Sequence, residues 1–271
     1  WLVLGADAIK FEKIFPEKFG KRFGLLTNSG SSANLLMMLA MTSKRGRNLP
    51  KGTKVITPIA GFPTTINPIL QVRFSPVFVD IEFDTLNFDV NKILEKITTR
   101  TRAIIVSPVL ANPPDMDKIK GLCLSNNLVL IGDNCDSLGT KWDGKLLTDM
   151  YYCWSTSFYP AHHMSTGEGG MVSSNDEKLI DVVRSFSWWG RDCYCVGSNN
   201  MLCNGTCGNR FDKWLEKYDG IIDHKYVFTN MGYNLKPMDL QGSIGLVQLR
   251  KFDEIDINRK ESKKRIESIL L

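Results

Sequence analysis

The sequence contains no long apolar run, no strong excess of charge and no internal repeat. Its apolar runs fall well short of the ~20 residues needed to cross a bilayer, so we expect no membrane partner. The net charge of +5 comes from 34 basic and 29 acidic residues, and these residues are spread along the chain. A nucleic-acid-binding surface is therefore not expected, whereas a small anionic substrate would fit.

The sequence also lacks an initiator methionine, since its first methionine is Met37. The opening residues, Trp1 to Leu4, have neither the basic start nor the cleavage site of a signal peptide. At the other end, Leu271 falls inside an amphipathic, charge-rich helical pattern that begins near Asp256. We therefore expect a fragment of a longer cytoplasmic protein.

Seven cysteines are present, and four of them lie between Cys193 and Cys207. An odd number of cysteines without a secretory leader argues against a disulfide framework. In a reducing compartment such a cluster indicates metal binding or redox chemistry. Cys123 and Cys153 stand in apolar contexts, and we interpret them as small buried hydrophobic residues.

The first half of the chain alternates short β-branched runs with helical patterns. This rhythm predicts an α/β domain with a doubly wound, mostly parallel sheet, whose ligand sites lie at the carboxyl ends of the strands. The expected strands are Lys54–Thr57, Pro76–Asp80, Ala103–Val106 and Leu128–Ile131, and the expected helices are Ser31–Thr42, Asn91–Ile97 and Asp115–Asn126. From about Trp188 to Gly220 no period is visible, which is typical of a functional segment.

Candidate binding residues stand at two turns and at one strand end. The segment from Asn28 to Ala33 (NSGSSA) begins an apolar helix, where backbone N–H groups and hydroxyls could bind a phosphate or simply cap the helix. Phe62, in the loop after Lys54–Thr57, could stack on a planar ring or pack in the core. Asp133 follows Leu128–Ile131 and could hold a pyridine nitrogen protonated, or cap a turn.

A longer motif, SFYPAHHMSTGEGG, runs from Ser157 to Gly170. The order of phosphate turn, aromatic loop, strand-end aspartate and this motif resembles the sugar aminotransferases of the DegT/DnrJ/EryC1/StrS family. The resemblance continues at residues 232–241 (GYNLKPMDLQ) and covers nearly the whole chain. In that family the sixth position of the longer motif is the lysine that attaches pyridoxal 5′-phosphate (PLP) covalently. In this sequence the position holds His162.

The histidine changes the chemistry that the resemblance implies. Without the lysine amine the cofactor cannot be held covalently, so ordinary transamination is compromised. An imidazole, with a pKa near neutrality, can still act as a general base. A degenerate protein without activity is the alternative, but it leaves the cysteines unexplained.

The cysteines narrow the resemblance to one branch of the family, the CDP-4-keto-6-deoxy-D-glucose 3-dehydrases of lipopolysaccharide biosynthesis. That branch is marked by a histidine in place of the lysine and by a [2Fe–2S] cluster on four cysteines. Cys135, Cys193 and Cys195 match three of these ligands. The fourth is Cys207 by local context, or Cys203 by spacing. Four thiolates also suit zinc, although the missing Cys-x-x-Cys pair favours iron.

The resemblance implies specific roles for the candidate residues. Pyridoxamine 5′-phosphate (PMP), bound noncovalently, would have its phosphate at Gly30, Ser31, Ser32 and Ser157, its ring under Phe62 and its ring nitrogen at Asp133. His162 would be the catalytic base for loss of the C3 hydroxyl from a CDP-linked 4-keto-6-deoxyhexose. A flavin and iron–sulfur reductase would supply electrons one at a time through the cluster. Asn234 would reach the phosphate in a neighbouring subunit, so a homodimer is expected.

The resemblance also implies the type I, aspartate aminotransferase-like fold of PLP-dependent enzymes. Residues 1–250 would form its large cofactor-binding domain, with residues 188–211 as a cysteine-rich segment. Residues 251–271 would begin a linker helix to a C-terminal small domain that is largely missing from the sequence. Two rival functions stay open: a nucleotide-sugar aminotransferase that uses a lysine from elsewhere, and a zinc-stabilised scaffold without catalysis.

Overall fold

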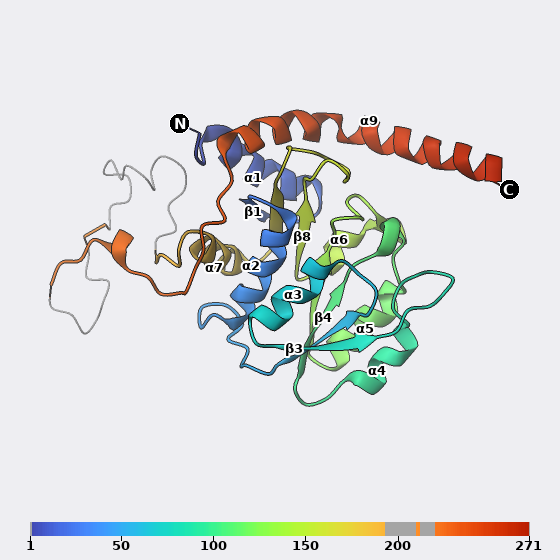
Figure 1. Cartoon of the computed structure of the whole chain (residues 1–271), viewed down its shortest axis with the longest axis horizontal. Coiled ribbons are helices and arrows are strands. Elements are labelled where there is room, and N and C mark those ends of the chain that lie inside the picture. Colours follow the sequence, from blue (N-terminus) through green and yellow to red (C-terminus); the bar gives the residue numbers. More distant parts are fainter. Residues whose placement is uncertain (1, 193–209, 212–219, 271) are drawn as a thin grey trace.

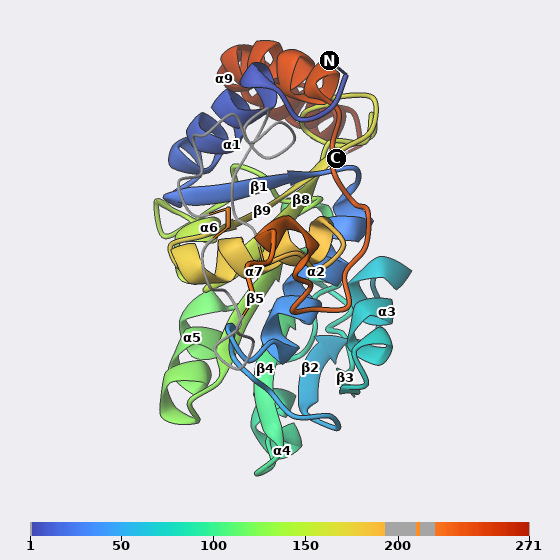
Figure 2. The same ribbon diagram turned by 90° about the vertical axis from the view of Figure 1, so that its left-hand side faces the viewer.

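The computed structural model describes residues 2–192, 210–211 and 220–270. A seven-stranded sheet runs through it with helices on both faces (Figures 1 and 2). The strand order is β1-β9-β8-β5-β4-β2-β3, and β3, β2, β4, β5 and β8 are parallel to one another. β9 is antiparallel to both of its neighbours. The strands are β1 Phe23–Thr27, β2 Lys54–Pro58, β3 Ser75–Val79, β4 Thr101–Val106, β5 Val129–Asp133, β8 Cys153–Ser157 and β9 Gly170–Ser174, with a small hairpin of β6 Lys141–Trp142 and β7 Lys145–Leu146.

The mostly parallel α/β sheet predicted from the sequence is confirmed, and each of the four expected strands is present within two residues. The helices are α1 Ala6–Lys18, α2 Gly30–Thr42, α3 Pro63–Gln71, α4 Ile93–Lys96, α5 Met116–Ser125, α6 Leu147–Met150, α7 Glu177–Ser187 and α9 Asp239–Leu270. Short 3-10 turns cover Val90–Lys92, Val109–Ala111 and His224–Tyr226. None of the helices in this described part of the chain is both long and apolar enough to cross a membrane.

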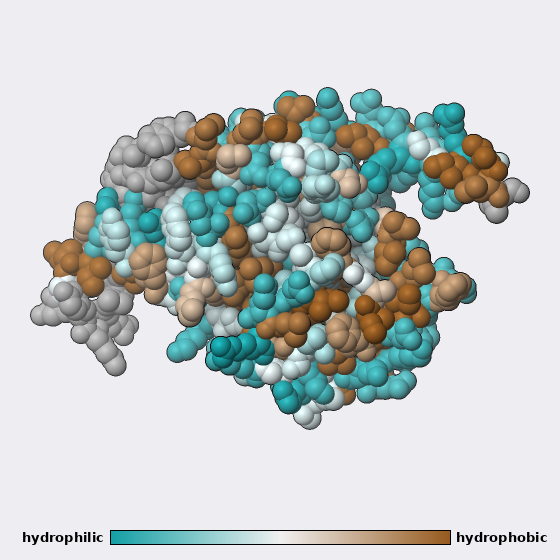
Figure 3. All heavy atoms as spheres, in the orientation of Figure 1, coloured by the Kyte–Doolittle hydropathy of each residue, from teal (hydrophilic) through white to brown (hydrophobic). Residues whose placement is uncertain are grey.

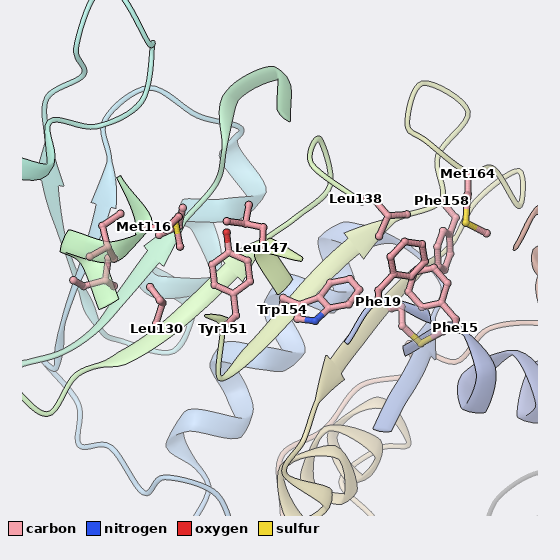
Figure 4. Close-up of a cluster of buried hydrophobic side chains, with 14 of the residues drawn as sticks. Phe15, Phe19, Met116, Leu130, Leu138, Leu147, Tyr151, Trp154, Phe158 and Met164 are labelled. Carbon is pink, nitrogen blue, oxygen red and sulfur yellow. The ribbon is translucent and has the colours of Figure 1, made fainter. Parts of the chain in front are cut away.

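Alternate residues of the central strands supply two separate cores, one on each face of the sheet. On β4, Ile104 belongs to the first core and Ile105 to the second, because successive side chains of a strand point to opposite faces. The first core includes aromatic side chains of α1 and β8, among them Phe15 and Trp154 (Figure 4). The second core packs α2, α3 and α7 against the other face.

The C-terminal helix differs from its prediction. The helical pattern was expected to begin near Asp256, but α9 begins at Asp239. Its first turns pack closely on α1, since a Cβ at Gly242 would lie 2.4 Å from Cα of Ala8. Asp239 also accepts hydrogen bonds from the backbone N–H of Gly5 (3.0 Å) and of Ala8 (2.8 Å), which caps α1.

The second half of α9 extends past the other described residues (Figure 1). Its last turns stand clear of the body of the molecule, and apolar side chains gather at its tip (Figure 3). The apolar residues of this half that are more than half exposed are Ile257, Ile266, Ile269 and Leu270.

Candidate active site

A cavity of about 280 Å³ lies at the carboxyl ends of the parallel strands. This edge of an open α/β sheet is where ligands bind, because loops from several strands converge there. The lining comes from the start of α2, from the segments after β2, β4 and β8, and from the end of β5. It consists of Gly30, Ser31, Phe62, Thr64, Ser107, Asp133, Cys135, Asp136, Ser157, Tyr159, Ala161 and His162.

A larger hollow, of about 630 Å³, lies along the outer turns of α9. Only α9 residues between Ile255 and Glu267 line it, and it is open to solvent. The smaller cavity brings together a histidine, two carboxylates, a thiol and several hydroxyls from separate elements. It is therefore the candidate active site.

Asp133 forms part of the cavity wall at the last residue of β5, and it is 5% exposed. Its Oδ2 accepts hydrogen bonds from Asn34 Nδ2 (2.8 Å) and from the Thr65 hydroxyl (2.6 Å). Its Oδ1 accepts one longer bond, from the backbone N–H of Cys135 (3.3 Å). The carboxylate is thus fixed in orientation and keeps acceptor capacity on Oδ1.

The start of α2 provides backbone N–H groups at another part of the cavity. Ser29 caps the helix by accepting a hydrogen bond from the N–H of Ser32 (3.1 Å). Gly30 approaches β8 so closely that a Cβ there would lie 2.5 Å from Cβ of Ser157. The absence of a side chain at Gly30 therefore leaves room at a helix N-terminus, which favours bound anions such as phosphate.

The family resemblance predicts that Ser32 contacts the phosphate as well, but Ser32 does not line the cavity. Its hydroxyl instead lies 3.0 Å from that of Ser29, within the cap. Ser157 does line the cavity, and its hydroxyl accepts a hydrogen bond from the N–H of Tyr159 (3.2 Å). Phe62 precedes α3, lines the cavity and is 68% exposed, so its ring is available to a planar ligand.

His162 lines the cavity from the segment after β8. Its Nδ1 lies 3.1 Å from Oδ1 of Asp136, and its backbone N–H donates to the carbonyl of Tyr159. The hydrogen bond from His162 lowers the pKa of Asp136 below its ordinary value. Because Nδ1 carries the donated hydrogen, Nε2 is the ring nitrogen free to act as a base.

His163 is separated from this site, although it follows His162 directly. It lines a different hollow, together with Asp256 and Arg259 of α9. Burial, together with the positive charge of Arg259, lowers the pKa of His163 to about 4. His163 is therefore neutral at physiological pH and is not a second base in the cavity.

Of the predicted cluster ligands, the structure describes Cys135 alone, while Cys193, Cys195, Cys203 and Cys207 lie outside the described residues. Cys135 lines the cavity, and burial, aided by Asp133, raises the pKa of its thiol well above the ordinary value. Among the described residues, no group of three or more histidine, cysteine, aspartate or glutamate side chains is arranged so that it could hold a metal ion.

Cys123 and Cys153 are buried and unbonded to other cysteines, which confirms their interpretation as small hydrophobic residues. Burial raises the pKa of each thiol to about 12.

Asn234 lies outside the cavity and is exposed. It pairs with Trp188 in an isolated β-bridge, and its side-chain oxygen accepts a hydrogen bond from Nζ of Lys236. The structure therefore does not bring Asn234 to the cavity of its own chain.

The residues that position the candidate groups were not predicted from the sequence. Asn34 and Thr65 donate to Asp133 without lining the cavity. Thr64, Ser107 and Tyr159 add hydroxyls to the lining. No sequence signal identifies them, because their roles arise from contacts between separate elements.

The described lining fits a pyridoxal-type cofactor. A helix N-terminus faces the cavity, a buried carboxylate keeps one oxygen available, and an exposed aromatic ring stands beside them. These groups match the phosphate, the ring nitrogen and the ring face of such a molecule.

Comparison with known proteins agrees with this geometry. The sequence profile of the DegT/DnrJ/EryC1/StrS aminotransferase family matches residues 1–271. The chain belongs to this family. Solved structures similar to this DegT/DnrJ/EryC1/StrS chain have the PLP-dependent aminotransferase fold, so the predicted fold class is confirmed.

Two relatives of this family member share about two fifths of its residues. The lipopolysaccharide biosynthesis protein RfbH of Salmonella typhimurium is 41% identical over 262 residues, which are 96% of this chain and 59% of that protein. The dTDP-4-dehydro-2,6-dideoxy-D-glucose 3-dehydratase of Saccharopolyspora spinosa is 42% identical over 268 residues, 98% of this chain and 57% of that protein. The chain thus spans less than two thirds of the length of either relative.

A solved structure with PLP is also similar. The E. coli GDP-4-keto-6-deoxy-D-mannose-3-dehydratase with bound hydrated PLP superimposes with a TM-score of 0.81 at 28% identity. The match covers 96% of this chain and 64% of that one.

Proposed function

We propose that the chain is the cofactor-binding part of a PMP-dependent nucleotide-sugar 3-dehydratase. The observation that carries the proposal is that His162 lines the same cavity as Asp133. None of the twelve described lining residues is a lysine, so no amine among them can attach the cofactor. The names of the two 41–42% identical relatives support a role in deoxysugar and lipopolysaccharide chemistry.

The chain's own residues would bind the cofactor in three places. The backbone at Gly30 and Ser31, with the hydroxyl of Ser157, would hold the phosphate. Phe62 would cover the ring, and Asp133 would accept a hydrogen bond from the ring nitrogen. When bound, PMP supplies a protonated ring that accepts electron density while a hydroxyl leaves the sugar.

His162 would act as the catalytic base. Asp136 accepts the hydrogen on Nδ1, so the free Nε2 can take up a proton at the cavity and later return one. This arrangement uses the imidazole for proton transfer and leaves the cofactor free of any covalent bond to the protein.

The substrate and partners follow from the family branch that the sequence resembles. The substrate would be a CDP-linked 4-keto-6-deoxyhexose, which loses its C3 hydroxyl on the way to a 3,6-dideoxyhexose. Cys135, Cys193 and Cys195 would hold a [2Fe–2S] cluster with Cys207, or with Cys203 as the fourth ligand. A flavin and iron–sulfur reductase would deliver electrons to it. Asn234, exposed and outside the cavity of its own chain, would serve a second subunit in a homodimer.

A hydrogen-exchange experiment tests the proposal. Full-length protein that contains this chain is incubated with PMP and substrate in D₂O, and deuterium at C4′ of the cofactor is followed by NMR. We expect exchange with the unmodified protein and with His163→Asn, and none with His162→Asn at unchanged PMP affinity. Equal exchange with His162→Asn would remove the base role.

The two rivals give different results with the same protein. A nucleotide-sugar aminotransferase with a lysine from elsewhere would retain PLP covalently after borohydride reduction, and mass spectrometry would locate the modified lysine. A zinc-stabilised scaffold would contain zinc after oxygen-free purification and would bind no cofactor. Iron with acid-labile sulfide, together with noncovalent PMP, supports the dehydratase.

A further inference from the structure

Three buried side chains outside the cavity form a hydrogen-bond network behind Asp133. Asn34 of α2 and Thr65 of α3 both donate to Oδ2 of Asp133. Ser155 of β8 donates its hydroxyl to Oδ1 of Asn34 at 2.5 Å, which fixes the amide so that its N–H points at Asp133. Asn34, Thr65 and Ser155 are each at most 5% exposed.

The network treats the two oxygens of Asp133 differently. Oδ2 accepts two short bonds from side chains, whereas the bond that Oδ1 accepts from the Cys135 backbone is longer, at 3.3 Å. A carboxylate offers about four acceptor positions in all. Oδ1 therefore retains more acceptor capacity, and Asp133 as a whole lines the cavity. The two side-chain donors bind Oδ2, so Oδ1 is the oxygen with more capacity to accept a hydrogen bond from a ligand.

We propose that Asn34 and Thr65 are positioning residues that set how Asp133 meets the cofactor ring. The inference rests on the proposed function insofar as it needs a pyridine nitrogen in this cavity. A carboxylate and a pyridine nitrogen share one proton, and hydrogen bonds donated to the carboxylate stabilise its negative charge. The two donors therefore favour the arrangement with the proton on the ring, which is the form that accepts electrons.

A purely structural role is the alternative, because the same bonds connect α2 and α3 to the sheet. The two roles differ in what they predict for the bound cofactor. A structural role changes only the stability of the protein, whereas a positioning role changes the electronic state of the ring in protein that is fully folded.

The test compares variants at Thr65 in the full-length protein. Thr65→Val removes the hydroxyl at nearly constant shape, and Thr65→Ser keeps it. Thr156→Val is a matched control, since the buried hydroxyl of Thr156 has no hydrogen-bond partner within the described chain. Each protein is loaded with PMP that carries ¹⁵N in the ring. The ¹⁵N chemical shift reports whether the ring is protonated, and equilibrium dialysis gives the dissociation constant.

We expect a protonated ring in the unmodified protein, in Thr65→Ser and in Thr156→Val. In Thr65→Val the shift should move toward the unprotonated value, and PMP should bind roughly tenfold more weakly, as expected for one lost charge-assisted hydrogen bond. Ser155→Ala, which frees the amide of Asn34, should move the shift in the same direction by less. This variant serves as the test if Thr65→Val fails to fold.

The outcomes separate this inference from the proposed function. If the unmodified protein binds PMP with a protonated ring and neither Thr65→Val nor Ser155→Ala changes the shift or the affinity, the positioning role is wrong and the proposed function stands. If the unmodified protein binds no PMP, both fail together.

Discussion

Nδ1 of His162 lies 3.1 Å from Oδ1 of Asp136, although 26 positions separate the two residues in the sequence. The carboxylate stands at the surface, with 58% of its side chain exposed, while the imidazole is 22% exposed. An exposed ion pair adds little to stability. The contact therefore matters for orientation: it selects the imidazole tautomer whose Nε2 is free.

Replacing Asp136 tests this orientation. In Asp136→Asn the amide can present its N–H to the imidazole and stabilise the tautomer with the hydrogen on Nε2, which cannot act as a base there. We expect C4′ hydrogen exchange to slow by roughly 10²-fold or more, within the range contributed by a positioned general base, while PMP affinity stays unchanged. Asp136→Glu should recover part of the rate, and an Asp136→Asn protein with full exchange would contradict the orienting role.

The strand-end residues could be predicted because β topology follows local pattern. Ile104 and Ile105 are buried on opposite faces, and such β-branched runs indicate parallel strands. Once the strands are parallel, their carboxyl ends share one edge, so Phe62 and Asp133 were expected together. The placement of His162 depended on a longer motif, since a lone histidine carries no positional signal.

What could not be predicted depends on contacts between distant segments. Asn34 is one polar residue in an apolar helix, and nothing local shows that it faces Asp133. The start of α9 was placed too late because Gly242 and Gly245 weaken the local helix signal. In the fold these glycines allow close approach to α1, since a Cβ at Gly245 would lie 2.7 Å from the ring of Phe11.

His163 predicts a pH dependence of stability. Burial and Arg259 lower its pKa from 6.5 to about 4, so the folded protein binds this proton less readily than the unfolded chain does. The resulting stabilisation is fully present above pH 6.5 and is lost as the pH falls toward 4. After allowance for the partial exposure of His163, the free energy of unfolding should fall by about 2 kcal/mol as the pH falls toward 4.

The measurement is the free energy of unfolding by urea at several pH values between 7 and 4. In His163→Gln the part of the slope due to this residue should disappear, so the variant should approach or exceed the unmodified protein near pH 4. His162→Gln is the comparison, because His162 lines the active-site cavity and not the hollow that contains His163. An unchanged slope in His163→Gln would mean that other groups cause the pH dependence.

Ala111 predicts a stabilising substitution. It has a φ of 64° in the turn after β4, and this left-handed region is unfavourable for any residue with a Cβ. Glycine avoids that cost, although it gains freedom in the unfolded chain. We expect Ala111→Gly to raise the free energy of unfolding by about 0.5–1 kcal/mol. The exposed Ala6, at the start of α1, is the control: Ala6→Gly should lower it.

We predict that the iron content of the protein depends on the thiol of Cys135. Burial and the neighbouring Asp133 keep this thiol protonated in the metal-free chain, so bound iron would have to displace the proton. A protonated thiol is a poor nucleophile, because the thiolate is the reactive form. Cys135 lines the same cavity as His162, and under the proposed function electrons would reach the substrate in this cavity. We therefore expect Cys135→Ala to lose most of its iron and acid-labile sulfide after oxygen-free reconstitution.

Cys123→Ala provides the matched comparison, because burial also raises the pKa of the Cys123 thiol, but Cys123 stands on α5, away from the cavity lining. Its iron content should equal that of the unmodified protein, because a buried thiol that binds no metal contributes packing alone. Both variants remove one sulfur, so a nonspecific effect of thiol loss or of weakened folding would lower iron in both. A selective loss in Cys135→Ala assigns the ligand. Iron at the level of the unmodified protein in both variants would exclude Cys135 from the cluster.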